Sequence, residues 1–179
     1  RQGFNFIHDL LLFGKELRSI QKELWDQLIK DRKNINGLIQ WPTGTGKRVA
    51  IIMVIIILYI YYKSIGKPFR CVVAANRNDI FDGSAWEEYE MIKNCGLSVF
   101  KGSKGKLKEK YEEIKENESF LLITTHHSLI KDKSDDLSED GNRLKDLDID
   151  CMIYDETQNI TSPAMYEYCL LYTSPSPRD

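Results

Sequence analysis

A glycine-rich turn placed ahead of a long apolar segment constrains this chain more than any other feature. In the stretch Gln40-Trp41-Pro42-Thr43-Gly44-Thr45-Gly46-Lys47-Arg48, the two glycines and the lysine lie between the apolar run over residues 35–41 and the apolar residues 49–62. Glycines let main-chain N–H groups turn inward around a phosphate, and the positive end of a helix dipole strengthens such a site. Lys47 adds a point charge for the outer phosphates. The stretch therefore predicts a strand, a phosphate-binding loop and a helix.

Arg48, the last residue of this stretch, departs from the usual pattern. A Ser or Thr commonly follows the lysine, and its hydroxyl binds Mg²⁺. A fixed cation there changes both the charge and the metal coordination, although a guanidinium can still pair with phosphate. Two accounts of Arg48 stay open. It is a sequencing error, since one base separates a Thr or Ser codon from an Arg codon, or the lineage has lost its metal site.

The bulk composition predicts one globular domain with a sizeable core. The chain has 179 residues, of which 42% are hydrophobic and 29% charged. A net charge of −2 gives no global attraction to nucleic acid, so any such binding must come from a local basic face. The four cysteines are widely spaced, which argues against a zinc knuckle or a disulfide scaffold and indicates a reducing compartment.

Residues 49–62 are continuously apolar, which raises the question of a membrane span. The segment is shorter than the roughly 18–20 residues that a spanning helix needs, and Lys47, Arg48 and Lys63 close it off. We expect a helix buried between a sheet and other helices, with no membrane as partner. The many β-branched residues leave a strand as the alternative.

Apolar runs alternate with amphipathic segments along the chain, which predicts a mainly parallel sheet covered by helices on both faces. We expect strands over residues 38–41, 70–75, 97–100, 120–125 and 149–154, and helices over residues 14–29, 82–93 and 104–115. Residues 131–148 are polar and predict a mobile loop with a short helical turn at residues 142–147. The expected fold class is a three-layer α/β domain.

Two carboxylates, Asp155 and Glu156, follow the last of these apolar strands. Ligands of parallel sheets bind at the carboxyl ends of the strands, so these acids and the glycine-rich loop are expected to meet at one crevice. Asp155 can hold the water shell of Mg²⁺, and Glu156 can orient and deprotonate an attacking water. A solvated turn is the alternative for the acid pair alone, but the pair and the loop together predict nucleotide hydrolysis.

In this order the motifs resemble the first RecA-like motor domain of superfamily 2 DEAD/DEAH-like helicases, near the type III restriction-subunit-like and large-DNA-virus group. The resemblance covers roughly residues 17–168 and implies a P-loop NTPase fold that uses ATP and Mg²⁺. It implies nucleotide binding by Gln21, Pro42, Thr43, Gly44, Thr45, Gly46, Lys47 and Arg48. It implies catalytic roles for Lys47, Asp155, Glu156 and Gln158, with Asp155 also the metal residue. Gln158 ends an Asp-Glu-x-His/Gln box, in which the restriction-like group usually has His.

The resemblance also implies contacts outside the phosphate loop. Gln21 ends a segment similar to the family's arginine–glutamine signature, which makes it an adenine contact; an exposed helix glutamine is the alternative. Arg77 follows the second apolar strand and is a candidate contact to the nucleic-acid backbone, with a surface arginine as the alternative. Asn76, just before it, stands where the family often has proline.

Thr124 and Thr125 match the family's Thr-Thr…Ser-Leu segment on the nucleic-acid side. A hydroxyl at a strand end can bond a phosphate without adding charge. The next two residues, His126 and His127, have no acidic or cysteine partner at a matching spacing. We therefore expect no metal site at the histidine pair.

The last eleven residues, 169–179 (CLLYTSPSPRD), fit nothing before them. Back-translated, they match a common transposon-end sequencing adapter read in frame; a natural Ser/Pro-rich linker is the alternative. We expect residues 1–168 to be a truncated N-terminal helicase ATP-binding domain and residues 169–179 to be a non-native tail. Because the chain begins at Arg1 rather than Met, its natural start is expected to be missing as well.

The resemblance thus implies an intracellular, cytoplasmic helicase or translocase that acts on DNA or RNA. Its second RecA-like domain, which supplies the arginine finger, is expected to be missing from this chain. As written, the fragment is expected to bind nucleotide weakly and hydrolyse little. Two alternatives remain: a translocating restriction-enzyme subunit, and a catalytically silent nucleic-acid-binding module if Arg48 is authentic.

Overall fold

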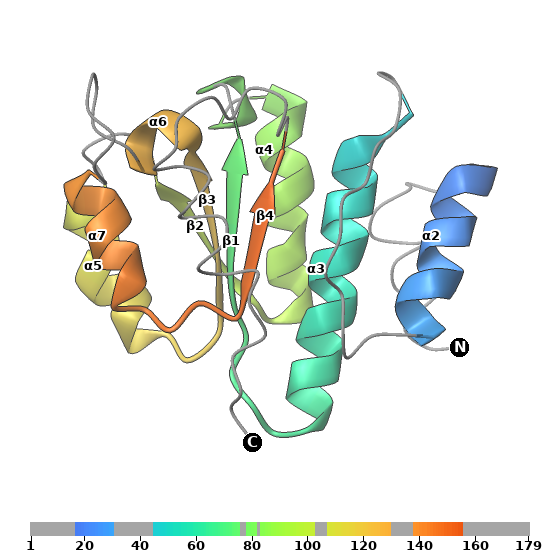
Figure 1. The fold of residues 1–179 in the computed structure, drawn as a ribbon, viewed down its shortest axis with the longest axis horizontal. Helices are drawn as coiled ribbons and strands as arrows, with labels where there is room; N and C mark the ends of the chain where they lie inside the picture. The colour runs from blue at the N-terminus through green and yellow to red at the C-terminus, as the bar shows by residue number, and fades with distance from the viewer. Residues whose placement is uncertain are drawn as a thin grey trace.

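A parallel β-sheet forms the centre of the structure (Figure 1). The computed structural model describes residues 17–30, 45–75, 78–81, 83–102, 107–129 and 138–155. Its sheet has the order β2-β3-β1-β4, built from β1 (Arg70–Ala75), β2 (Ser98–Gly102), β3 (Phe120–Thr125) and β4 (Cys151–Tyr154). In the register of these strands, Ala74 lies between Thr124 and Tyr154. The carboxyl ends of β3, β1 and β4 therefore lie side by side.

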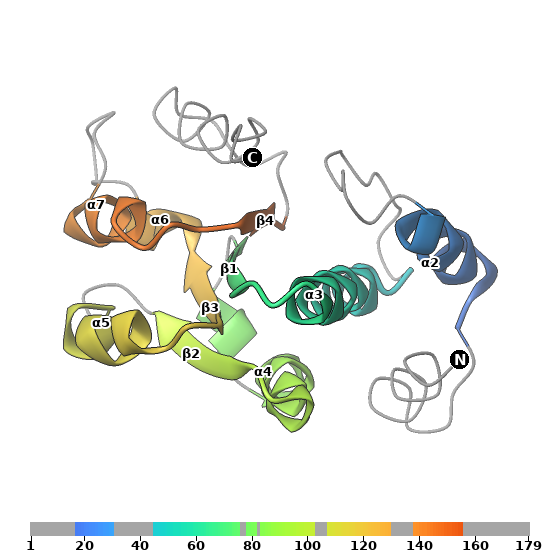
Figure 2. The same ribbon diagram turned by 90° about the horizontal axis from the view of Figure 1, so that it is seen from below.

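Helices cover both faces of this sheet, as Figure 2 shows from below. One face carries α3 (Lys47–Ser64) and α4 (Gly83–Glu90), and α2 (Ser19–Lys30) lies outside α3. The other face carries α5 (Leu107–Glu116), α6 (His126–Leu129) and α7 (Glu139–Lys145). Two short 3₁₀ helices, η1 (Asn78–Phe81) and η2 (Met91–Cys95), flank α4. The expected α/β class with a parallel sheet is confirmed.

The apolar runs predicted from the sequence form two hydrophobic cores, one on each face of the sheet. Every residue of β3 is buried, as are all but the first of β1, which is what continuous apolar strands between two helix layers require. Side chains of α3 fill the core on its face of the sheet, where Ile52, Met53 and Ile55 are at most 1% exposed. The predicted buried helix over residues 49–62 is therefore confirmed, and the strand alternative is wrong. Within the described ranges, no helix is long and apolar enough to cross a membrane.

Several element boundaries differ from the sequence expectations; the expected strand over residues 149–154, for example, begins at Cys151. The predicted helix over residues 82–93 ends as α4 at Glu90 and continues as η2, which Gly96 stops in a left-handed conformation with φ 89°. The strand expected from residue 97 begins at Ser98. The helical turn expected at residues 142–147 is instead α7, which begins at Glu139 because the Ser138 hydroxyl caps it by accepting from the Gly141 N–H at 3.0 Å. The expected strand over residues 38–41 lies outside the described residues.

Candidate nucleotide-binding site

Helix α3 begins at the edge of the sheet toward which the strands point (Figure 1). Gly46 caps it with φ 85° and ψ 42°, and its carbonyl accepts the first helical bond, from the Ala50 N–H at 3.3 Å. The N–H groups of the first turn have no partner inside a helix, and the helix dipole makes this end positive. Lys47, the first residue of α3, is half-buried and adds its ammonium group. The start of α3 thus has the donors and the charge that a phosphate needs.

Gln21 holds this start of α3 against α2. Its side chain is 3% exposed, and its Oε1 accepts from the Arg18 N–H at 3.0 Å, which caps α2. Its Nε2 donates to the carbonyl oxygens of Thr45 at 3.3 Å and Gly46 at 3.4 Å. Gln21 is thus a buried bridge between α2 and the loop end rather than an exposed helix glutamine. Its predicted contact with adenine stays a prediction.

Arg48 pairs with a carboxylate of the neighbouring helix. Its Nη1 lies 3.2 Å from Oε2 of Glu88 on α4, with 41% of the Arg48 side chain and 36% of the Glu88 side chain exposed. Nothing in the sequence spacing signals this pair, because residues 48 and 88 are brought together only by the packing of α3 and α4 on one face of the sheet. Glu88 therefore balances the cation that replaces the expected hydroxyl.

Tyr89, next to Glu88 on α4, is a second residue that sequence reasoning missed. Its side chain is fully buried, and its hydroxyl has no hydrogen-bond partner among the described residues. Burial raises the pKa of Tyr89, the charge of Asp155 raises it further, and that of Arg48 lowers it. The phenol therefore lies within electrostatic reach of both Arg48 and Asp155. An aromatic residue on an apolar helix face reads from sequence only as core, so no local signal marks this hydroxyl.

Asp155 directly follows β4 at the same edge of the sheet. Its N–H donates to the Ala74 carbonyl at 2.9 Å, which extends the β1–β4 ladder by one residue and fixes where the side chain starts. The structure thus brings the start of α3 and Asp155 to one edge, as the parallel topology predicts. Glu156 and Gln158 lie outside the described residues, as do Pro42, Thr43, Gly44 and Arg77.

Thr124 and Thr125 end β3, two strands from Asp155, but their side chains are buried. The Thr124 hydroxyl donates to the Gly102 carbonyl at 2.7 Å, and that of Thr125 lies 2.8 Å from the Ser128 hydroxyl. His126 is also buried and lies with Nε2 2.9 Å from the Ala74 carbonyl, which can only accept, so Nε2 carries the proton. These groups are engaged inside the protein, and the predicted contact of the threonines with nucleic acid stays a prediction.

The family model described as "Type III restriction enzyme, res subunit" matches residues 14–177. The chain belongs to this family. Neither a curated protein nor a solved structure matches it. Membership confirms the resemblance read from the motifs and identifies an ATP-dependent, helicase-like motor domain, of a kind that generally uses ATP with Mg²⁺ and binds nucleic acid.

The residues of this res-subunit family domain suit the phosphates of a nucleotide better than they suit the Mg²⁺ ion that accompanies it. Lys47 and the first turn of α3 suit nucleotide phosphates, and Asp155 suits the water shell of Mg²⁺. Arg48 is a donor only and cannot coordinate a metal ion. The described residues contain no group of three or more His, Cys, Asp or Glu side chains that could hold a metal. Arg48 therefore does not fit an inner-sphere role at Mg²⁺.

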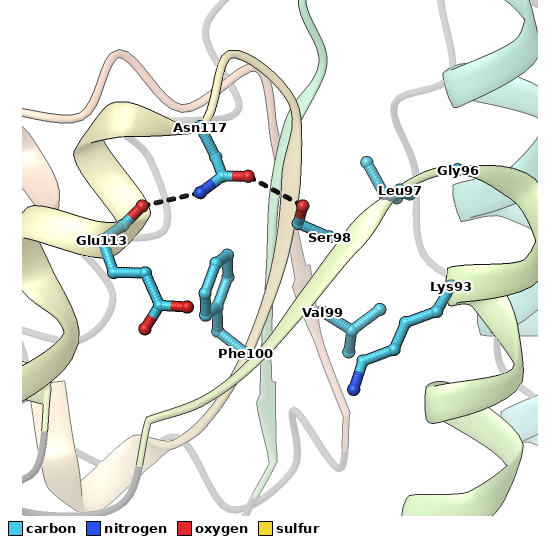
Figure 3. Close-up of a pocket in the computed structure, with 8 residues that line it drawn as sticks. All are labelled: Lys93, Gly96, Leu97, Ser98, Val99, Phe100, Glu113 and Asn117. Atoms are coloured by element: carbon cyan, nitrogen blue, oxygen red, sulfur yellow. Dashed lines mark hydrogen bonds between the residues drawn. The ribbon is translucent and has the colours of Figure 1, made fainter.

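A cavity of about 400 Å³ lies elsewhere on this res-subunit domain (Figure 3). Its lining comes from η2, β2 and the end of α5: Lys93, Gly96, Leu97, Ser98, Val99, Phe100, Glu113 and Asn117. The Asn117 amide is already bonded, accepting from the Ser98 hydroxyl at 2.8 Å and donating to the Glu113 carbonyl at 2.7 Å. The cavity sits at the start of β2, at the opposite edge of the sheet from Asp155, so it is separate from the nucleotide-binding site.

Proposed function

We propose that this chain is the ATP-binding half of a nucleic-acid helicase or translocase. The observation that carries the proposal is the shared edge: α3 begins, and β4 ends, at the side of the sheet toward which the parallel strands point (Figure 1). Family membership supports the same conclusion. ATP supplies the free energy for movement along nucleic acid, and Mg²⁺ neutralises the charge that develops on its phosphates.

In this proposal the residues have separate roles. Lys47 contacts the outer phosphates, together with the N–H groups of the first turn of α3. Asp155 holds the water shell of Mg²⁺, and Glu156 orients the attacking water and takes its proton. Gln158 connects this site to the second motor domain. Gln21 fixes the loop end through Thr45 and Gly46, so it positions the phosphate site in addition to its predicted adenine contact.

In the intact parent, this half works with a second RecA-like domain and with DNA or RNA. Arg77, Thr124 and Thr125 are the proposed nucleic-acid residues, and a basic local face is needed because the chain as a whole is slightly acidic. A translocating restriction subunit is one form of this function, which the family description supports.

A catalytically silent nucleic-acid-binding module is the second candidate. The observation that favours it is Arg48, whose guanidinium takes the place of a metal-binding hydroxyl and is balanced by Glu88 at 3.2 Å. Under this alternative the domain keeps its fold and its nucleic-acid contacts but does not turn over ATP. Hydrolysis by the full-length parent, with and without DNA or RNA, separates the two, since nucleic-acid-stimulated turnover with Arg48 in place rules out the silent module.

ATP binding by the chain itself tests the proposed site. We expect Lys47→Ala to weaken ATP binding by about 10- to 100-fold, since it removes a charge-assisted contact. Lys63→Ala is the matched control, because Lys63 lies in the last turn of the same helix, with its Nζ 5.5 Å from the centre of the Tyr59 ring. Calorimetric titration measures both. Equal ATP affinities for the two variants would mean that Lys47 does not contact the phosphates, which would contradict the proposed site.

A further inference from the structure

The charge environment of Arg48 suggests how this site binds a nucleotide without a metal-binding hydroxyl. Arg48 directly follows Lys47, so two cations lie in the first turn of α3, where the helix dipole is already positive. Arg48 has no coordinating atom for Mg²⁺. A cation so close to a divalent ion also repels it. The residues therefore favour a phosphate over a hydrated metal ion at this position.

We propose that Arg48 is a direct ligand of the nucleotide phosphates and supplies charge compensation that Mg²⁺ otherwise provides, so that ATP binding by this chain depends little on Mg²⁺. The inference rests on the proposed function, that ATP binds at the start of α3. A guanidinium is a planar fork of N–H donors that matches two phosphate oxygens, and it never loses its charge at neutral pH. With Lys47 it gives the outer phosphates two permanent positive partners.

Glu88 orients the Arg48 side chain through an ion pair that is weak enough to exchange for a phosphate. The pair has a single 3.2 Å contact, and both side chains are more than a third exposed, so water screens their attraction. A pair of this kind is weak and exchanges readily for a doubly charged phosphate group. Because Glu88 also competes with the phosphate for the guanidinium, its charge lowers the affinity for nucleotide. Glu88 is thus a positioning residue for the proposed phosphate ligand.

The hydroxyl of Tyr89, the neighbour of Glu88 on α4, is a second, independent observation that points to a ligand. It belongs to the residue after Glu88, is buried, and has no hydrogen-bond partner among the described residues. Burial is the main cause of the raised pKa of Tyr89, so the phenol keeps its proton and remains a donor at neutral pH. A buried donor that the charges of Arg48 and Asp155 both influence, and that has no acceptor among the described residues, suits an oxygen of a bound ligand.

The test is the ATP dissociation constant of the whole chain, measured by calorimetric titration in Mg²⁺ and again in excess EDTA. The quantity compared is the ratio of the two constants. Arg48→Thr restores the metal-binding hydroxyl, and Glu88→Gln removes the competing charge while keeping the side-chain shape. Glu87→Gln is the matched control, since Glu87 is the preceding carboxylate of α4 and is exposed. Circular dichroism confirms that each variant is folded.

We expect the chain with Arg48 to bind ATP almost equally with and without Mg²⁺, and Arg48→Thr to bind about tenfold more weakly in EDTA than in Mg²⁺. Glu88→Gln should tighten binding in EDTA by about two- to fivefold, and Glu87→Gln should not change it. The same Mg²⁺ dependence in the unaltered chain and in Arg48→Thr would overturn the inference and leave the proposed function standing. No ATP binding under any condition would overturn both. If Arg48→Thr does not fold, an unchanged Mg²⁺-free affinity in Glu88→Gln overturns the inference.

Discussion

The end of β3 and the start of α3 lie at the same edge of the sheet, but their polar groups differ in burial and in hydrogen bonding. Thr124, Thr125 and His126 are at most 5% exposed, and each bonds to another part of the protein. Around the start of α3, residues 45–49 are only half-buried, Arg48 makes a surface ion pair, and the nearby Tyr89 hydroxyl is buried without a partner among the described residues. The polar groups at the end of β3 are hydrogen-bonded within the fold, and we propose that those around the start of α3 bind a ligand.

The difference teaches where substitutions should affect stability and where they should affect binding. A buried polar group that is bonded inside the protein stabilises the fold, and removing it leaves its partner unsatisfied. An exposed ion pair contributes little to stability because water screens it. We therefore expect the end of β3 to govern the free energy of unfolding, and the start of α3 to govern affinity for nucleotide.

The largest expected effect is at His126. His126→Ala removes a buried ring and its bond to the Ala74 carbonyl, so we expect the free energy of unfolding to fall by about 2–4 kcal/mol. His127→Ala is the control, because His127 is the exposed neighbour in the same short helix; it should change stability by less than about 0.5 kcal/mol. Urea denaturation measures both. A small loss in His126→Ala would mean that the end of β3 does not govern the free energy of unfolding.

The sequence predicts the sheet well because its strands are continuous apolar runs. β1 and β3 occupy the predicted residues 70–75 and 120–125, since a run buried on both faces admits few other placements. The end of η2 and the start of α7 were less predictable, because they depend on Gly96 in a left-handed conformation and on the Ser138 cap. Such local geometry is decided by the conformation of a single residue, which composition and periodicity do not report.

The second-largest expected effect on the free energy of unfolding is at Gly46, the residue that caps the start of α3. Gly46 and Gly66 both have positive φ, 85° and 67°, so an alanine is strained at either position. A Cβ at Gly46 would also collide with Nε2 of Gln21, whereas a Cβ at Gly66 meets nothing within 4 Å. We expect Gly46→Ala to lower the free energy of unfolding by about 2 kcal/mol and Gly66→Ala by about 1 kcal/mol.

The comparison of the two glycine variants in thermal unfolding isolates the contact with Gln21. Equal losses would show that Gln21 moves aside at no cost and does not fix the loop end. A larger loss in Gly46→Ala supports the bridge formed by the Gln21 amide with Thr45 and Gly46.

The candidate site could be predicted from sequence only in part. Lys47 and Asp155 are recognisable because a glycine-rich loop before a helix and an acid after a strand are local patterns, and parallel topology then brings them to one edge. Glu88 and Tyr89 were missed because their roles arise from the packing of α4 beside α3, which separates partners by 40 residues in the case of Arg48 and Glu88. Contacts between separate helices follow no fixed spacing in the sequence, so they cannot be predicted from a local pattern.

The smallest effect should come from Tyr89, and its sign is opposite to the others. Tyr89→Phe removes a buried hydroxyl that has no partner among the described residues, so we expect it to stabilise the empty protein by about 1 kcal/mol at pH 7. Tyr61→Phe, on a half-buried residue of α3, is the control and should not stabilise. For a domain of this size, a gain of about 1 kcal/mol corresponds to a rise in Tm of about 2–4 °C, which scanning calorimetry resolves.

The pH dependence of the same variant tests the buried phenol directly. The pKa of Tyr89 is raised above its ordinary value of 10.0 in the folded protein, chiefly by burial. Below pH 10 both folded and unfolded chains keep the proton, so the group gives stability no slope; above pH 10 only the unfolded chain loses it, and stability falls by up to about 1.4 kcal/mol per pH unit. Tyr89→Phe should therefore lose less stability between about pH 9 and pH 11 than the unaltered chain. Identical alkaline profiles would mean that the phenol reaches solvent, and that α4 offers no buried donor for a ligand bound at the start of α3.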